Sequence, residues 1–300
     1  VQHRAVGKLA GQGGARAGEA PRVTTYTAGI DVGSTYTKAL VLGDDHRIAG
    51  RAMRPTGFKL AEIAEEALAA AVAEAGLDAA AVRYVVATGF GRHQVRIGDL
   101  RVTDLTAAAR GATLLFPGTR TILDVGGQTM KASRLGEGAK VHSFRLNDKC
   151  AAGTGAFLEK TARYLGYATE EIGPLVATSK TPMAISGVCA VFAESEVINH
   201  LSQGVAPADI MHGAVVSLVG RSVQLMKRVG MEPEFTLIGG ILRFERMAHV
   251  IREQLGAEVN VPAGDLVQFT AALGAALLGH KRLAQLAAAG EGGVPLAQSA

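Results

Sequence analysis

Two cysteines, Cys150 and Cys189, are the only thiols in this chain of 300 residues. Each lies in a dense motif: residues 147–155 read NDKCAAGTG and residues 187–196 read GVCAVFAESE. An iron–sulfur cluster usually takes four thiolates, so one chain cannot supply the full set, whereas two chains can. Two buried apolar cysteines, or one disulfide, are the other interpretations of the same count.

A second pattern occurs twice. Residues 31–39 read DVGSTYTKA and residues 124–132 read DVGGQTMKA, so that both segments have D-V-G, four residues, and then K-A. Each segment follows an apolar run and precedes another, which is the pattern of a β-hairpin. The repetition predicts two related halves.

The chemistry of this repeat fits a nucleotide phosphate site. Glycine lets the backbone approach phosphates, and the hydroxyls of Ser34 and Thr35 add donors. Asp31 and Asp124, each at the end of a strand, can hold Mg²⁺ through water or orient the attacking water. A plain turn at a strand end explains one copy as well as a site does, but two copies with the same spacing favour the site.

The remaining elements alternate between strand and helix. Strands are expected at 27–31, 39–42, 84–87, 121–125 and 235–238, and helices at 60–75, 106–115, 156–165, 192–201, 210–229 and 271–283. This alternation predicts an α/β fold. Gly239 and Gly240 follow the last of these strands, where a glycine pair leaves room for adenine and ribose.

Composition excludes several other classes. No run of about 18 uncharged apolar residues is present, so no membrane span is expected. The net charge of +4 is small, and no basic stripe is interleaved with aromatic residues, so nucleic acid is not an expected partner. The first 22 residues lack the apolar stretch of a secretory signal and are expected to be a disordered tail, which together with the two cysteines predicts a cytoplasmic protein.

The hairpins and the late glycine pair resemble the acetate and sugar kinase, Hsp70 and actin superfamily, which implies two lobes around a nucleotide cleft. More narrowly, residues 147–155 and 192–197 resemble the ATPase family that activates 2-hydroxyacyl-CoA dehydratases and forms the ATPase subunits of benzoyl-CoA reductase. The resemblance runs from about Tyr26 to Arg282. Residues 157–167, FLEKTARYLGY, are closer to the benzoyl-CoA reductase subunits.

This resemblance implies an ATP-driven electron carrier. In the family, two homologous or identical subunits share one [4Fe-4S] cluster, to which Cys150 and Cys189 would each give a thiolate here. ATP and Mg²⁺ would drive an electron from reduced ferredoxin or flavodoxin onto a benzoyl-CoA reductase or, as the alternative, a 2-hydroxyacyl-CoA dehydratase. Asp31 and Asp124 would be catalytic, and the nucleotide would be bound by Gly33, Ser34, Thr35, Lys38, Gly126, Gly127, Gln128, Gly239 and Gly240. Thr129 departs from the family pattern, because many members carry aspartate there.

The expected organisation is a tail at 1–24, a first lobe at 25–117, a second lobe with both cysteines at 118–267, a helix at 268–289 returning to the first lobe, and a loose tail at 290–300.

Two other functions use the same fold. A small-molecule kinase needs a substrate pocket and a base beside the γ-phosphate, and a chaperone-like ATPase acts through protein contacts alone. Neither needs the pair of cysteines.

Overall fold

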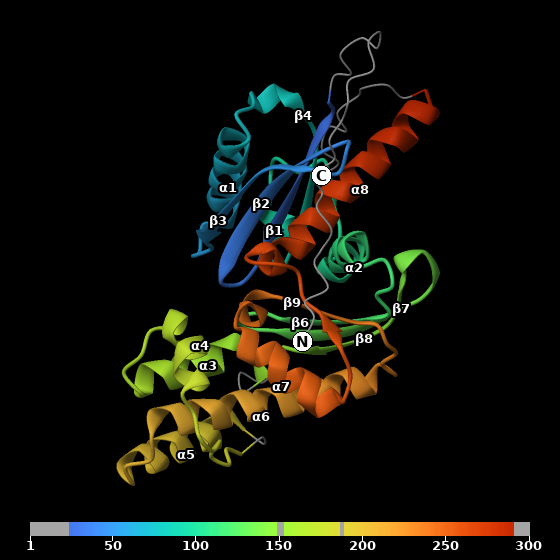
Figure 1. Ribbon diagram of the computed structural model, residues 1–300. Helices are drawn as coiled ribbons and strands as arrows, with labels where there is room; N and C mark the ends of the chain where they lie inside the picture. Colours follow the sequence, from blue (N-terminus) through green and yellow to red (C-terminus); the bar gives the residue numbers. More distant parts are fainter. Residues whose placement is uncertain (1–23, 149–152, 187–188, 291–300) are drawn as a thin grey trace, which may run out of the picture.

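The computed structural model describes residues 24–148, 153–186 and 189–290. In this part of the chain two five-stranded sheets lie one above the other (Figure 1). Cys150 lies outside the described residues, as does almost all of the two expected tails.

The first sheet has the strand order β3-β2-β1-β4-β5. β1 (Tyr26–Val32), β2 (Tyr36–Gly43) and β3 (Ile48–Pro55) are antiparallel neighbours, and β4 (Val82–Gly89) and β5 (Leu100–Arg101) continue the sheet in parallel beside β1. Helices cover both faces of β1, which explains why this strand is an almost continuous apolar run.

The second sheet has the order β10-β9-β6-β7-β8, which is the same construction. β6 (Thr121–Val125), β7 (Met130–Leu135) and β8 (Val141–Asn147) are antiparallel neighbours, and β9 (Phe235–Ile238) and β10 (Val259–Asn260) run parallel to β6. The repeated motif therefore occupies equivalent hairpins, β1–β2 and β6–β7.

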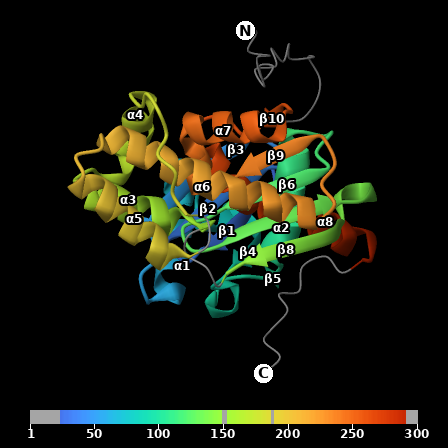
Figure 2. The same ribbon diagram turned by 90° about the horizontal axis from the view of Figure 1, so that it is seen from below.

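Helices form the layers outside the sheets. α1 (Leu60–Glu74) packs on the first sheet through an alanine-rich face. The second sheet packs on one large apolar core with the helices α3 (Gly155–Tyr164), α4 (Ile172–Ala177), α5 (Ala190–Ser202), α6 (Pro207–Arg228) and α7 (Glu245–Leu255). Figure 2 shows α3, α4 and α5 grouped at one side of this lobe.

Two helices cross between the lobes. α8 (Leu266–Ala288) follows the last strand of the second sheet but packs on the first sheet, where Thr27 donates to the Ala276 carbonyl at 2.7 Å. α2 (Asp104–Leu115) follows the first sheet but packs its alanines on the second, against Ile122 and Ile238. α2 and α8 also lie against each other. Each lobe therefore contributes one helix to the core of the other.

The predicted α/β fold with two phosphate-type hairpins is confirmed. The helix expected at 271–283 is longer than predicted, because Leu266, Val267 and Phe269 already lie on its apolar face. α4 and α7, which the sequence did not predict, are short or rich in charge, so their apolar stripe is narrow.

In the described ranges, no helix combines the length and the hydropathy that a membrane crossing requires.

Candidate functional site

The first hairpin places a carboxylate and an ammonium side by side. Asp31 and Lys38 face each other in the β1–β2 register, and Lys38 Nζ lies 3.2 Å from Asp31 Oδ2. Between them the chain turns, and the amide of Gly33 donates to the carbonyl of Tyr36 at 3.2 Å. Ser34 and Thr35 lie in this turn, partly exposed.

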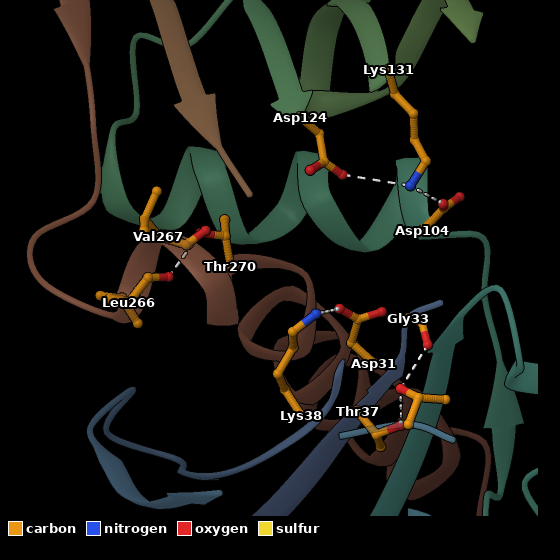
Figure 3. A network of polar contacts seen from close by, with 11 residues as sticks. Asp31, Gly33, Thr37, Lys38, Asp104, Asp124, Lys131, Leu266, Val267 and Thr270 are labelled. Carbon is orange, nitrogen blue, oxygen red and sulfur yellow. Dashed lines mark hydrogen bonds and ion pairs between the residues drawn. The ribbon is translucent and has the colours of Figure 1, made fainter. Parts of the chain in front are cut away.

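A buried threonine fixes the turn from behind. Thr56, which follows β3, donates its hydroxyl to the Gly33 carbonyl at 2.8 Å, and its amide donates to the Thr35 carbonyl at 2.9 Å. Thr37 Oγ1 lies 3.0 Å from the same hydroxyl (Figure 3). Thr56 is only 3% exposed, so these bonds form out of reach of water and hold the turn firmly.

The second hairpin repeats this arrangement with one addition. Asp124 and Lys131 face each other in the β6–β7 register, with Lys131 Nζ 3.5 Å from Asp124 Oδ2. The amide of Gly126 donates to the Thr129 carbonyl at 2.8 Å. Here the lysine has a second partner, because Asp104 at the start of α2 lies 2.5 Å from the same Nζ (Figure 3).

Burial and the shared Lys131 ammonium together shift the pKa values of the two aspartates. Burial raises the pKa of the Asp124 carboxyl above its ordinary value, and the more distant Lys131 offsets only part of that effect. Burial also acts to raise the pKa of Asp104, but the close Lys131 ammonium holds that pKa below its ordinary value. Burial acts to lower the pKa of Lys131 itself, yet the two carboxylates raise it. Asp124 is therefore the stronger proton acceptor of the two aspartates.

The two hairpins meet at their tips. A Cβ placed on Gly127 would lie 2.3 Å from Thr35 Oγ1, so the turns of the two lobes are in direct contact. In Figure 3 Asp31 and Asp124 come from opposite sheets and their side chains point into the space between them. Asp124 keeps 21% of its side-chain surface accessible, so water reaches its carboxylate.

Two glycines with positive φ pack against the two aspartates of the site. Gly89 ends β4 at φ 87° and Gly239 follows β9 at φ 100°. A Cβ on Gly89 would lie 2.4 Å from Asp31 Oδ1, and one on Gly239 would lie 2.7 Å from Asp124 Oδ1. Only glycine fits both the backbone conformation and the close approach, so each aspartate has a glycine of the neighbouring parallel strand as its support.

The second hairpin is bonded to the segment that follows Cys150. The amide of Gly155, the first residue of α3, donates to the Gly126 carbonyl at 3.0 Å, and the amide of Ala156 donates to the Gly127 carbonyl at 2.8 Å. Cys189 is a free, half-buried cysteine within the described residues and occupies the N-cap position of α5. Lys160 of α3 pairs with Glu194 of α5 at 2.8 Å, which ties the two helices together.

A groove of about 600 Å³ opens at Arg243, the last residue of the short helical turn Gly240–Arg243. Its wall on α4 is apolar, with Gly173 and Pro174, and its opposite wall is the segment from Arg243 to Arg252. The guanidinium of Arg243 lies 5.0 Å from the centre of the Phe244 ring. A flat, partly apolar group with a polar edge fits such walls.

The structure thus brings most of the predicted site residues into one place. The residues in mutual contact, or in contact through one neighbour, are Asp31, Gly33, Thr35, Lys38, Asp124, Gly126, Gly127 and Gly239. Ser34 and Gln128 lie in the turns, with Gln128 exposed, and Gly240 begins the short helical turn that leads to the groove. Thr129 contributes its carbonyl to the turn.

Four residues that contact the hairpins were not among the predicted site residues: Thr56, Gly89, Asp104 and Lys131. Lys131 has the same place in the repeat as Lys38, so the repeat itself contained the signal. The other three come from distant segments and carry no pattern that points to the hairpins.

Comparison with known proteins agrees with this geometry. The chain matches the BadF/BadG/BcrA/BcrD ATPase family over residues 28–279. It is 37% identical over 254 residues to the 2-hydroxyisocaproyl-CoA dehydratase activator of Clostridioides difficile, covering 84% of this chain and 94% of the relative. It is 37% identical over 274 residues to a benzoyl-CoA reductase subunit of Thauera aromatica, covering 87% and 96%.

Among solved structures, the activator of the 2-hydroxyisocaproyl-CoA dehydratase from Clostridium difficile with bound ADPNP superimposes with a TM-score of 0.82. The two chains are 34% identical, and the match covers 92% of this chain and 100% of that one.

Proposed function

The chain belongs to the BadF/BadG/BcrA/BcrD ATPase family, and from this premise we propose that it couples ATP hydrolysis to low-potential electron transfer onto a CoA-thioester enzyme. The acceptor proposed first is a benzoyl-CoA reductase, and a 2-hydroxyacyl-CoA dehydratase is the second candidate. The chain is 37% identical to a relative of each kind. The electron donor would be reduced ferredoxin or flavodoxin.

The two hairpins are suited to hold the ATP phosphates. The amides of Gly33 and Gly126 close the two turns. The amides and hydroxyls of Ser34 and Thr35 in the first turn, and the amides of Gly127 and Gln128 in the second, would supply donors from both lobes, with positive charge from Lys38. The groove between α4 and Arg243 would take the adenine, with the Gly239–Gly240 turn beside the ribose. Similarity to a protein whose structure holds ADPNP supports the binding of a nucleotide.

Asp124 is the residue that we assign to the attacking water. Its raised pKa makes it a better proton acceptor than Asp104, and its partly accessible carboxylate is open to water. Asp31, paired with Lys38, would hold Mg²⁺ through water together with phosphate oxygens. Among the described residues no group of three His, Cys, Asp or Glu side chains is arranged to hold a metal ion, so phosphate and water would supply the other Mg²⁺ ligands.

The described cysteine fits a cluster ligand. Cys189 is free, partly accessible and at a helix N-terminus, and the described part of α5 supplies no side-chain cap to its first amides. Those amides and the helix dipole would stabilise the negative charge of a cluster bound there. Val191 and Phe192 beside it are 66% and 62% exposed, an apolar surface suited to a second subunit. Cys150 and Cys189 of two chains would then give four thiolates, and the bound [4Fe-4S] cluster would supply a one-electron carrier.

One observation carries this proposal. The carbonyls of Gly126 and Gly127, in the turn assigned to phosphate, accept the first two amides of α3, which begins five residues after Cys150. A shift of this turn on hydrolysis would move the start of α3 with it. The phosphate site and the cysteine segment are therefore mechanically connected within one lobe.

The test is an anaerobic purification with iron analysis. We expect about four iron atoms per dimer for the wild type, and loss of iron in Cys150→Ser and in Cys189→Ser with affinity for ADPNP retained. Ser202→Ala, at the far end of α5, is the matched control and should keep its iron. An iron-free wild type that phosphorylates a sugar or a carboxylate would replace the proposal with a kinase. Reconstitution with reductase subunits or with dehydratase subunits then distinguishes the two acceptors.

A further inference from the structure

Among the described residues, Phe58 and Phe90 are the most exposed large apolar side chains, at 89% and 74%. Phe58 lies between β3 and α1, and Phe90 directly follows β4. Phenylalanine this exposed is costly in water, and two such side chains on one surface mark a contact site.

The two loops lie side by side. Gly91, next to Phe90, packs so closely that a Cβ there would lie 3.1 Å from Leu60 Cδ1, two residues after Phe58. The same Cβ would lie 2.4 Å from Val32 Cγ1, so both loops rest on the end of β1.

Both loops are bonded to the first phosphate hairpin. The amide of Gly91 donates to the Val32 carbonyl at 2.9 Å, and Thr56, two residues before Phe58, donates to the Gly33 carbonyl at 2.8 Å. The surface is therefore built on the turn assigned to ATP.

The two segments that carry the phenylalanines are basic, and the nearest acidic residues in the sequence, Glu62 and Asp99, lie just outside them at exposed positions. Residues 54–60 and 89–98 contain Arg54, Lys59, Arg92, His93 and Arg96, and they contain no aspartate or glutamate. Arg54, Lys59 and Arg96 are exposed. An apolar centre with a basic rim complements an apolar patch with an acidic rim.

We propose that Phe58, Lys59, Phe90 and Arg92, here called the aromatic–basic patch, dock the electron donor, a small protein with an acidic surface of the ferredoxin or flavodoxin type. This inference rests on the proposed function. A second copy of this chain fits less well, because apposition of two such patches would bring like charges together.

The patch also has a short route to the cysteine segment. Thr56 donates to the Thr35 carbonyl at 2.9 Å, and Thr35 touches Gly127, whose carbonyl accepts the amide of Ala156 in α3. A donor on the patch therefore sits on the same connected set of turns that holds ATP and leads to Cys150.

The experiment measures binding of a bacterial two-[4Fe-4S] ferredoxin and of a flavodoxin to the full chain by calorimetry. We expect the Phe58→Ser/Phe90→Ser double variant, and separately Lys59→Glu, to lose affinity by about tenfold or more, as buried aromatic and charged contacts do. Raised salt should weaken binding to the wild type. Phe144→Ser is the matched control, because Phe144 on β8 is 46% exposed and precedes an arginine.

Unchanged affinity in the patch variants, or a failure of the wild type to bind either carrier, would overturn the docking inference. Dissociation of the dimer by the double variant would overturn it too, because the patch would then be a subunit contact. Reduction by dithionite distinguishes failure of the docking inference from failure of the proposed function. A wild type that holds no reducible cluster refutes the proposed function. If dithionite reduces all variants equally, the proposed function stands even where the docking inference fails.

Discussion

Replacing Asp104 by asparagine should shift the pH dependence of ATP hydrolysis to lower pH. Lys131 Nζ lies 2.5 Å from Asp104 Oδ2 but 3.5 Å from Asp124 Oδ2. With the competing carboxylate neutral, Lys131 is free to move to Asp124. The ionised form of Asp124 gains stabilisation, so its pKa falls.

The magnitude follows from the two distances. At an effective dielectric constant of about 20, closing the Lys131–Asp124 distance from 3.5 Å to about 2.8 Å adds about 1 kcal/mol of attraction. The two carboxylate oxygens share one Nζ and are therefore at most about 6 Å apart, so loss of the Asp104 charge removes about 3 kcal/mol of repulsion on the same scale. Water reaches these side chains and reduces both effects, and we expect the pKa of Asp124 to fall by at least about one unit, or about 1.4 kcal/mol.

The assay is single-turnover ATP hydrolysis as a function of pH. Asp124 accepts a proton only when it is ionised, so activity is lost as the pH falls through its pKa. The acid limb of the Asp104→Asn variant should lie at least about one pH unit below that of the wild type. Lys131→Met is the complementary variant. It removes the attraction between Lys131 and Asp124, so its acid limb should lie at higher pH than that of the wild type. An acid limb that stays in place, or moves upward, in Asp104→Asn would refute the assignment of Asp124 as the proton acceptor.

Two further substitutions test the support of the hairpins. Gly239→Ala places a Cβ 2.7 Å from Asp124 Oδ1 at a φ of 100°, and it should lower kcat for ATP hydrolysis by displacing that carboxylate. Gly264→Ala has a similar φ of 58° but open space around it, so it should lose only thermal stability, and equal kcat values in the two variants would contradict the prediction. Thr56→Val keeps the shape but leaves the Gly33 carbonyl unsatisfied, a cost of about 1–3 kcal/mol that should weaken ADPNP binding in calorimetry. Thr56→Ser should restore the affinity, and a wild-type affinity in Thr56→Val would show that the turn needs no such anchor.

The repeat in the sequence was sufficient to predict the two hairpins. Identical spacing from aspartate to lysine fixes the register, and the structure pairs Asp31 with Lys38 and Asp124 with Lys131. A period-2 pattern with a turn of fixed length leaves one register that buries the apolar face. The α/β class was also accessible, because buried strands and amphipathic helices have different periods.

The residues that contact the hairpins from other elements could not be predicted from the sequence in the same way. Asp104 reaches Lys131 because α2 leaves the first sheet and packs on the second, and Thr56 reaches Gly33 because β3 returns beside β2. Both contacts depend on tertiary placement, and a single aspartate or threonine in a loop has many ordinary roles. The packing of α2 on the second sheet likewise leaves no local signal, since its buried alanine-rich face could pack on either sheet. The helix at 268–289, in contrast, was expected to return to the first lobe.

The comparison of the two halves shows where they diverge. Each half has an aspartate, a lysine and a supporting glycine in equivalent positions, namely Asp31, Lys38 and Gly89 in the first and Asp124, Lys131 and Gly239 in the second. In the second half the lysine is shared with a further carboxylate, and burial together with the charge of Asp104 raises the pKa of Asp124. Under the proposed function the two halves would differ in role, with the first half binding Mg²⁺ and the second accepting the proton.

The outer connections of the halves diverge as well. The first hairpin is bonded to the loops of the aromatic–basic patch, and the second is bonded to the start of α3. ATP bound between the two turns would therefore contact both the hairpin that carries the proposed donor surface and the hairpin bonded to α3. Hydrolysis would weaken these contacts. Because the Thr35–Gly127 contact joins the turns of the two lobes, it is a place where the two bonded sets would separate.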